Sequence, residues 1–257
     1  MLKNRHTPRD EIYFLIRTLS ADFNDSQTLS THSHPWGQLI YAASGVMTVW
    51  TEQGSWVAPP HWAVWAPAGV AHAMRFTGRT SVRTLYLRPE LAAGLSPRSA
   101  VITVSGLLRE LVLRAVDIGF LDERVEAHAA MARLIVHEIH AHPAAPTLDL
   151  PMPQSTLLRQ VAAVVLEAPA DREGHAMLSK RFGIGARTLE RGFVSETGLT
   201  LGRWRSQARF LHALRLLGGG AAVKEVAIES GYQSPSAFIA AFRRSLGTTP
   251  CRYFGSP

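Results

Sequence analysis

The 257-residue sequence predicts an α+β protein with two domains, an N-terminal β-barrel with attached helices and a C-terminal all-α module that contains two helix-turn-helix motifs. Three observations lead to this prediction. Short strand-like runs punctuated by glycine and proline fill residues 29–89, and a helix–glycine–helix pattern occurs twice after residue 155. The net charge of +7 belongs entirely to residues 155–257.

The N-terminal domain, residues 1–141, begins with a polar and weakly patterned lead-in, residues 1–28. The next residues are rich in Val, Trp, Tyr, Thr and Gly, and closely spaced short strands with Gly/Pro turns are typical of a small barrel or sandwich. The strand-like runs lie at 38–51, 54–60, 61–74 and 84–89.

After about residue 99 the apolar residues recur at helical spacing, which predicts two helices over roughly 103–119 and 124–140. Leu107 and Leu111 lie on the apolar face of the first of them. We expect this pair of helices to form the contact of a homodimer. A segment with four prolines, 142–154, follows and is interpreted as the linker to the second domain.

The second domain, 155–257, carries the same local pattern twice. In each copy a short apolar run precedes a glycine, and two apolar residues follow it at i and i+4, as in a helix-turn-helix. The copies are 48 residues apart up to the glycine and 49 after it. The matched residues are Leu178, Gly183, Leu189 and Phe193 in the first copy and Val226, Gly231, Phe238 and Phe242 in the second.

Charge and composition favour double-stranded DNA as the partner of the second domain. It holds 14 lysine and arginine residues against 7 acidic ones, whereas residues 1–154 hold 13 of each. A basic module beside a neutral one indicates a polyanion partner for the basic module. The chain has one cysteine, Cys251, and no apolar run of membrane-spanning length. We therefore expect a cytoplasmic protein without a membrane partner.

Over nearly its full length the sequence resembles the AraC/XylS family of transcription regulators. RTLERGF (187–193) is similar to the first recognition helix of that family, and GYQSPSAFIAAFRRSLGTTP (231–250) to its second helix-turn-helix with the closing Thr-Pro. Arg203–Leu217 then resembles the helix that joins the two units. The resemblance implies a seven-helix DNA-binding module whose recognition helices enter successive major grooves, roughly 34 Å apart.

The barrel segment resembles the cupin fold, which the same family often carries as its sensor. The first cupin motif is matched as His32-x-His34-x3-Gln38-x6-Gly45, and part of the second as Pro67-x-Gly69-x2-His72. The chain departs from the pattern at three positions. Gln38 replaces the usual Glu, His61 replaces the opening Gly of the second motif, and Phe76 replaces its closing Asn.

The exposed faces of the two recognition helices supply the candidate DNA-binding residues. With Leu189 and Phe193 toward the core, the opposite face of the first helix carries basic and acidic side chains that can bond guanine or cytosine edges. The face of the second helix is poorer in long polar side chains and suits backbone contacts. An ordinary solvated surface is the alternative for each. The candidates are Arg187, Glu190, Arg191, Ser236 and Arg243 for bases, and Arg203, Arg209 and Arg244 for phosphates.

The candidate metal ligands are His32, His34, Gln38 and His72. Imidazoles suit a divalent Zn, Fe or Ni ion, and an amide oxygen is a weak fourth ligand. Because the carboxylate is missing, we expect at most weak metal binding. The alternative is a pocket for an organic effector in which the histidines donate and accept hydrogen bonds.

Together these features predict a DNA-binding transcription regulator that responds to a small-molecule or metal signal, with activation and repression both open. The resemblance implies no enzyme. Two other functions are weighed against this prediction. One is a metal-dependent cupin enzyme with an appended DNA-binding module, and the other is an architectural DNA-binding protein that needs no effector.

Overall fold

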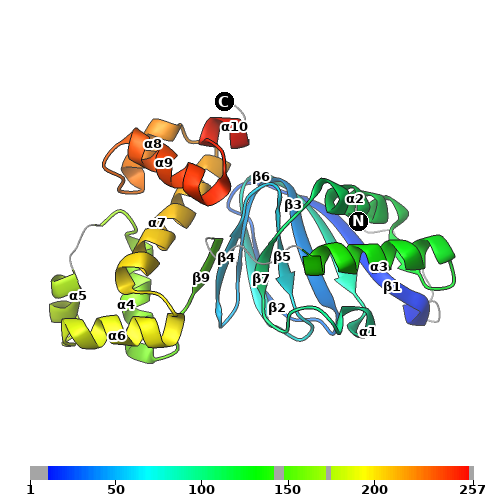
Figure 1. Cartoon of the computed structure of the whole chain (residues 1–257), viewed down its shortest axis with the longest axis horizontal. Coiled ribbons are helices and arrows are strands. Elements are labelled where there is room, and N and C mark those ends of the chain that lie inside the picture. Colours follow the sequence, from blue (N-terminus) through cyan, green and yellow to red (C-terminus); the bar gives the residue numbers. More distant parts are fainter. Residues whose placement is uncertain (1–10, 142–147, 172–174, 255–257) are drawn as a thin grey trace.

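A computed structural model describes residues 11–141, 148–171 and 175–254 (Figure 1). The N-terminal domain is built on a nine-stranded antiparallel sheet. A short 3-10 helix, Glu11–Tyr13, precedes the sheet, and the one-turn helix α1 (Pro89–Ala92) follows its sixth strand. The strands are β1 (Phe14–Phe23), β2 (Thr28–His32), β3 (Gly37–Trp50), β4 (Gly54–Ala58), β5 (Trp62–Ala66), β6 (His72–Leu87), β7 (Ala100–Thr103), β8 (Phe120–Asp122) and β9 (Asp149–Pro151).

The two longest strands, β3 and β6, form the centre of the barrel. They pair with each other, and each takes two further partners at its two ends. β3 pairs with β5 through residues 38–41 and with β4 through 47–50. β6 pairs with β2 near its start and with β1 over 80–87. The β3–β6 register shifts on both sides of Ser44, and such irregularities bend strands, so the sheet wraps around its own interior (Figure 1).

The weakly patterned lead-in contains a strand that the sequence pattern did not indicate. Phe14–Phe23 forms β1, which lies between β6 and β8 in the sheet. The first residues of β1, Phe14, Leu15 and Ile16, are all buried. This strand therefore lacks the strict alternation of buried and exposed residues that would mark it in a sequence.

The two helices that the sequence predicts are present, and they cover one face of the sheet. α2 (Gly106–Ile118) packs on β1, β6 and β8, and α3 (Glu126–Ala141) packs on α2, β1 and β8. Ser105 begins α2 as its N-cap, because its hydroxyl accepts a hydrogen bond from Leu108 N. The same hydroxyl donates to Glu138 Oε2 at 2.6 Å and so ties α2 to α3. Residues 100–103, just before α2, form strand β7.

Part of the predicted linker is built into the sheet. Residues 142–147 lie outside the described residues, and residues 149–151 form β9, which pairs with the edge strand β4. The other side of β9 faces α7 (Leu201–Gly218). Trp204 on α7 donates its indole N–H to Pro151 O at 2.7 Å, and Gln207 donates to Asp149 O. β9 therefore connects the two domains by hydrogen bonds to both.

The C-terminal module contains seven helices within the described residues. α7 runs between its two halves and alongside the barrel (Figure 1). Among the described residues, none of the helices has the length and hydropathy that a transmembrane span requires. The other six helices are α4 (Thr156–Glu167), α5 (His175–Arg181), α6 (Ala186–Thr197), α8 (Val223–Glu229), α9 (Pro235–Leu246) and α10 (Pro250–Phe254).

The two domains pack closely where α7 ends on the barrel. A Cβ atom added to Gly218 would lie 2.3 Å from Val46 Cγ2, far inside van der Waals contact. Gly78 of the barrel has φ +70°, and a Cβ atom added there would lie 2.3 Å from the Gly218 carbonyl oxygen. The buried side chains of the barrel interior continue through this contact into the core of the helical module. A glycine at the end of α7 is therefore needed for the two domains to touch.

Candidate functional sites

The first helix-turn-helix consists of α5 and α6, and α6 presents the predicted DNA-binding face. Leu189 and Phe193 are fully buried, and the Phe193 ring meets Trp204 of α7 edge-on at 5.5 Å. This packing leaves Arg187 and Arg191 exposed on the opposite face. Glu190 departs from the prediction because it is half-buried with Oε2 out of contact with solvent. Two arginines, and not the carboxylate between them, therefore dominate the outward face of α6.

The N-terminus of α6 has no side-chain cap, since Gly185 stands at the N-cap position. The second unit, α8 and α9, differs. Ser234 is the N-cap of α9, and its hydroxyl accepts a hydrogen bond from Ala237 N at 3.1 Å. Gly231 in the turn has φ +72°, and a Cβ there would lie 2.7 Å from Ala170 O. Glycine is thus required both by the backbone conformation and by the space available.

The outward face of α9 carries Ser236 and Arg243, both exposed as predicted, while Phe238 and Phe242 are fully buried. The three predicted phosphate-contacting arginines lie together. They line a groove of about 440 Å³ between α7 and α9, which also contacts Leu199 at the end of the α6–α7 turn. These arginines are Arg203, Arg209 and Arg244. Arg203 and Arg244 are 41 positions apart in the sequence, and the fold brings all three arginines onto one cationic surface.

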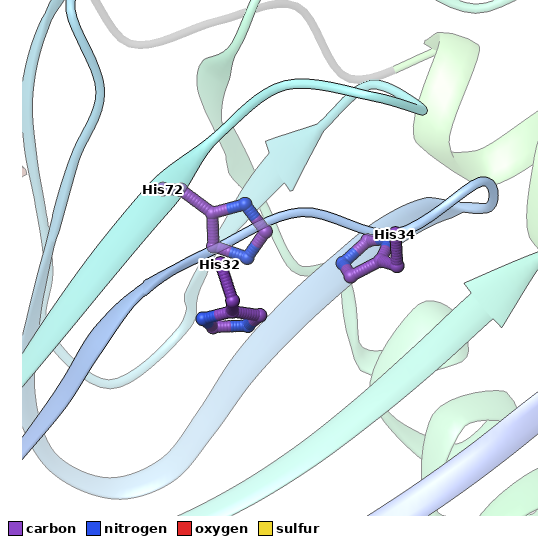
Figure 2. Close-up of side chains that lie close together, drawn as sticks. All are labelled: His32, His34 and His72. Atoms are coloured by element: carbon purple, nitrogen blue, oxygen red, sulfur yellow. The ribbon is translucent and has the colours of Figure 1, made fainter.

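The three histidines of the barrel also come together, from the end of β2, the loop after it and the start of β6 (Figure 2). One ring nitrogen of each lies within 4.8 Å of the others, and His72 is fully buried. In every ring Nδ1 contacts a backbone carbonyl, which can only accept, so Nδ1 carries the hydrogen. The pairs are His32 with Ser30 O at 2.9 Å, His34 with Trp36 O at 2.6 Å and His72 with Val70 O at 2.8 Å.

Gln38 completes this site with its amide oxygen. Thr84 Oγ1 donates to Leu39 O at 2.9 Å, so it accepts from Gln38 Nε2 at 3.0 Å. That bond fixes the amide and turns Gln38 Oε1 toward the rings, 2.9 Å from His34 Nε2 and 3.0 Å from His72 Nε2. When the imidazoles are neutral, each Nε2 presents a lone pair to an oxygen that also has only lone pairs.

At the centre of the site, Gln38 Oε1 and the Nε2 atoms of His34 and His72 are therefore all hydrogen-bond acceptors, and a proton or a cation between them would make their close approach favourable. Protonation of one ring could supply the missing positive charge, but burial lowers the pKa of His72, and the nearby His32 and His34 lower it further against the opposing effect of the Val70 carbonyl. A divalent cation could supply it as well. Two ligands of one ion with bonds of about 2.1 Å lie roughly 3 Å apart or somewhat more, which the spacing of Gln38 Oε1 and the two nitrogens matches. The residues present thus fit a metal ion.

Two departures from the cupin motif have structural reasons. His61, in place of the usual Gly, has φ +69°, a left-handed conformation that favours glycine. Its carbonyl accepts from Val104 N at 2.8 Å, and its ring meets Tyr253 of α10 edge-on. Phe76, in place of Asn, is fully buried and stacks on Phe23 with ring centroids 3.8 Å apart. His61 therefore contributes to the contact between the domains, and Phe76 contributes to the core of the barrel.

Comparison with known families agrees with this architecture. A model of the AraC-like ligand binding domain matches residues 14–154, and a model of a helix-turn-helix domain matches residues 178–256. This chain belongs to the AraC family of transcription regulators. The AraC-family chain is 31% identical over 229 residues to the HTH-type transcriptional regulator NimR of Escherichia coli, a match that covers 89% of this chain and 83% of NimR. These matches identify a DNA-binding transcription regulator with a ligand-binding domain, and not an enzyme.

Other proteins match a smaller part of this AraC-family regulator, or match most of it at low identity. RipA of Corynebacterium glutamicum is 35% identical over 108 residues, which are 42% of this chain and 32% of RipA. The DNA-binding domain of AdpA in complex with a target DNA is 36% identical, over 40% of this chain and 93% of that domain, with a TM-score of 0.37. ToxT from Vibrio cholerae is 9% identical over 93% of this chain and 98% of its own length, with a TM-score of 0.40.

Proposed function

We propose that this regulator reads its operator mainly through Arg187 and Arg191 of α6. Both guanidinium groups are exposed on one helix face, and Leu189 and Phe193 hold that helix rigidly against α4 and α7. A guanidinium on a recognition helix can donate two hydrogen bonds to guanine O6 and N7. The single observation that carries this proposal is that two exposed arginines lie on one face of α6 while Leu189 and Phe193 on the opposite face are fully buried.

The second unit has a different role in this proposal. The α9 face offers Ser236 and Arg243 but few other long polar side chains. The arginine groove between α7 and α9 lies beside it and suits the phosphate backbone, because guanidinium groups bind phosphates without regard to base identity. We assign α6 to base recognition and α9 with this groove chiefly to positioning on the duplex.

The test compares operator and random DNA in the full-length protein. Arg187→Ala or Arg191→Ala should weaken operator binding by about 1–3 kcal/mol and leave random-sequence binding nearly unchanged. Arg98→Ala, an exposed arginine in the loop before β7, is the matched control and should change neither. Equal losses on both DNAs would show that the two α6 arginines touch only phosphates.

We also propose that the barrel binds one divalent metal ion, Zn, Fe or Ni, with His32, His34, His72 and Gln38 as ligands. The support is that the three imidazoles and the Gln38 amide oxygen converge on one point. Each Nδ1 is already bound to a backbone carbonyl, and Thr84 fixes the Gln38 amide. Carbonyl partners on the far ring nitrogen orient histidines for metal binding. Because all four ligands are neutral, the ion keeps its full charge, and binding should be modest.

Elemental analysis and zinc titration of the full-length protein test the metal site. His34→Ala and His72→Ala should abolish the bound metal, while Gln38→Glu should tighten binding about tenfold or more because a carboxylate neutralises part of the charge. His137→Ala, an exposed histidine on α3, should behave as the wild type. Unchanged metal content in His72→Ala, or no uptake by the wild type, would favour the alternative, a pocket in which the histidines only form hydrogen bonds.

The bound metal, or a small molecule held by it, is the proposed signal of this regulator in the cytoplasm.

The proposed assembly is a homodimer through α2 and α3. Its support is two large apolar side chains on the outer faces of these helices, Leu107 with 49% and Leu134 with 38% of its surface exposed. Leu111 is half-buried against the core beneath α2 and contributes less to the outer face.

A further inference from the structure

The recognition helix α6, which the structure describes in full, carries one large apolar side chain on its outward face. Of the three large apolar residues of this helix, Leu189 and Phe193 are fully buried, whereas Val194 is 44% exposed. Val194 follows Arg191 by three positions and Arg187 by seven, so these three side chains lie on one side of the helix. The stripe that is proposed to read bases therefore ends in a pair of methyl groups.

The backbone at Val194 is held in place by the end of the helix. Gly198, the C-cap of α6 with φ +74°, donates its N–H to Val194 O at 3.0 Å. A β-branched side chain in a helix strongly prefers one χ1 rotamer, so the two methyl groups of Val194 keep a fixed direction. A contact made by these methyl groups therefore costs little conformational entropy.

The other flank of Arg191 has a different chemistry. A hollow of about 360 Å³ lies there, lined by Thr188, Arg191, Gly192 and Ser195. Thr188 and Ser195 offer hydroxyl groups, which bond phosphate oxygens as well as base edges. Val194, on the opposite side of Arg191, has no group that bonds a phosphate oxygen or a polar base edge. This asymmetry matches the Val194 flank to an apolar feature of the DNA.

The apolar feature that the major groove presents is the C5-methyl group of thymine. Residues three positions apart on a helix are about 4.5 Å apart along its axis, and stacked base pairs are about 3.4 Å apart. Val194 can thus reach a base pair next to the one that Arg191 contacts. Since an arginine bonds guanine O6 and N7 bidentately, the thymine would lie beside a guanine in the operator.

We propose that Val194 contacts the C5-methyl group of a thymine in the base pair next to the guanine that Arg191 binds. This inference rests on the proposed reading of bases by α6, and it adds an apolar contact to the hydrogen bonds of the arginines. Because thymine and uracil differ only in this methyl group, replacing one by the other tests the contact directly.

The experiment begins with selection of tight sites from random DNA duplexes by the full-length wild-type protein. Each thymine of a selected site is then replaced singly by deoxyuridine, which removes the methyl group and keeps the hydrogen-bonding groups of the base. One such replacement, in the base pair beside a guanine, should weaken wild-type binding about three- to fivefold, the effect of losing one buried methyl group. No sensitivity to deoxyuridine at any position would overturn the proposal.

Variants then assign the methyl contact to Val194. In Val194→Ala the same deoxyuridine replacement should change affinity by less than about twofold, because the shorter side chain no longer reaches the methyl group. Val194→Ile should keep the wild-type ratio of the two affinities. Arg244→Ala, at a proposed phosphate contact, is the control, because it should weaken both duplexes equally and also keep the ratio. An undiminished ratio in Val194→Ala would show that another residue contacts the methyl group, and would overturn the proposal.

Failure of this inference is distinguishable from failure of the proposed function. If α6 does not read bases, Arg187→Ala and Arg191→Ala weaken operator and random DNA equally. If α6 reads bases without Val194, the arginine variants lose sequence preference, while the deoxyuridine ratio is the same in Val194→Ala as in the wild type.

Discussion

Asp149 on β9 should make this protein less stable as the pH rises from about 4 to about 6. Burial raises the pKa of its carboxyl group from 3.8 to about 6, and Oδ1 is buried without a hydrogen-bond partner in the described chain. Asp149→Asn keeps the size of the side chain and removes the charge. The substitution should also leave the Asp149 carbonyl free to accept from Gln207.

The magnitude follows from proton linkage. Below pH 3.8 the carboxyl group is protonated in the folded and the unfolded chain, and the folded state has its full stability. Between about pH 4 and 6 the unfolded chain releases the proton while the folded chain retains it, so the free energy of unfolding falls by about 1.4 kcal/mol per pH unit. A rise of about two units thus gives a loss of at most about 3 kcal/mol, complete above pH 6.

The assay is urea denaturation of the wild type and Asp149→Asn at several pH values from 4 to 8. Only the difference between the two proteins is interpreted, because other carboxylates titrate in the same range. Asp122, for example, has its pKa lowered by hydrogen bonds from Arg124 and loses its stabilising effect as the pH falls. The two proteins should be nearly equal in stability at pH 4, and the variant should be more stable by up to about 3 kcal/mol at pH 7 and above.

Two outcomes would refute the reasoning about Asp149. A difference that stays constant from pH 4 to 8 would show that the substitution changes packing and not ionisation. A variant less stable than the wild type at pH 8 would show that the charged carboxylate has a favourable partner in the folded state.

Two further predictions concern DNA affinity and assembly. If about five phosphates are contacted, a plot of log affinity for DNA against log salt concentration should have a slope near −4 to −5 for the full-length protein. Arg244→Ala should make this slope shallower by about one. An unchanged slope in that variant would show that the α7–α9 groove is not part of the DNA interface. In sedimentation experiments the wild type should be a dimer at micromolar concentration. Leu107→Glu should be a monomer, because the substitution would bury a charge at the proposed dimer contact. A monomeric wild type would contradict the proposed homodimer.

The helical module was predictable because its signals are local. Glycines such as Gly231 are imposed by the turn itself, and apolar pairs such as Phe238 and Phe242 at i and i+4 report which face is buried. β1 was missed because three consecutive residues at its start, Phe14–Ile16, are all buried, so the strand does not begin with the alternation that marks a half-buried strand. Glu190 was placed outward by helix periodicity, which does not reveal that its side chain is half-buried with Oε2 out of contact with solvent.

The candidate sites show the same division. The histidine motif predicted the candidate ligands, but the role of Thr84, which fixes the Gln38 amide, depends on a pairing across 46 residues and has no signature in the sequence. The arginine groove between α7 and α9 likewise depends on the fold, because Arg203 and Arg244 are 41 positions apart in the sequence.

The position of β9 has a consequence for how this protein can be divided. A fragment that ends at residue 141 would leave β4 as an open edge, with N–H and C=O groups ready to pair with any extended strand, including the same edge of another copy. A fragment that starts at residue 155 would leave the Trp204 indole without its acceptor on Pro151. Self-association of an isolated N-terminal half would therefore report strand exchange as readily as native assembly, so the oligomeric state has to be measured on a chain that retains residues 148–152.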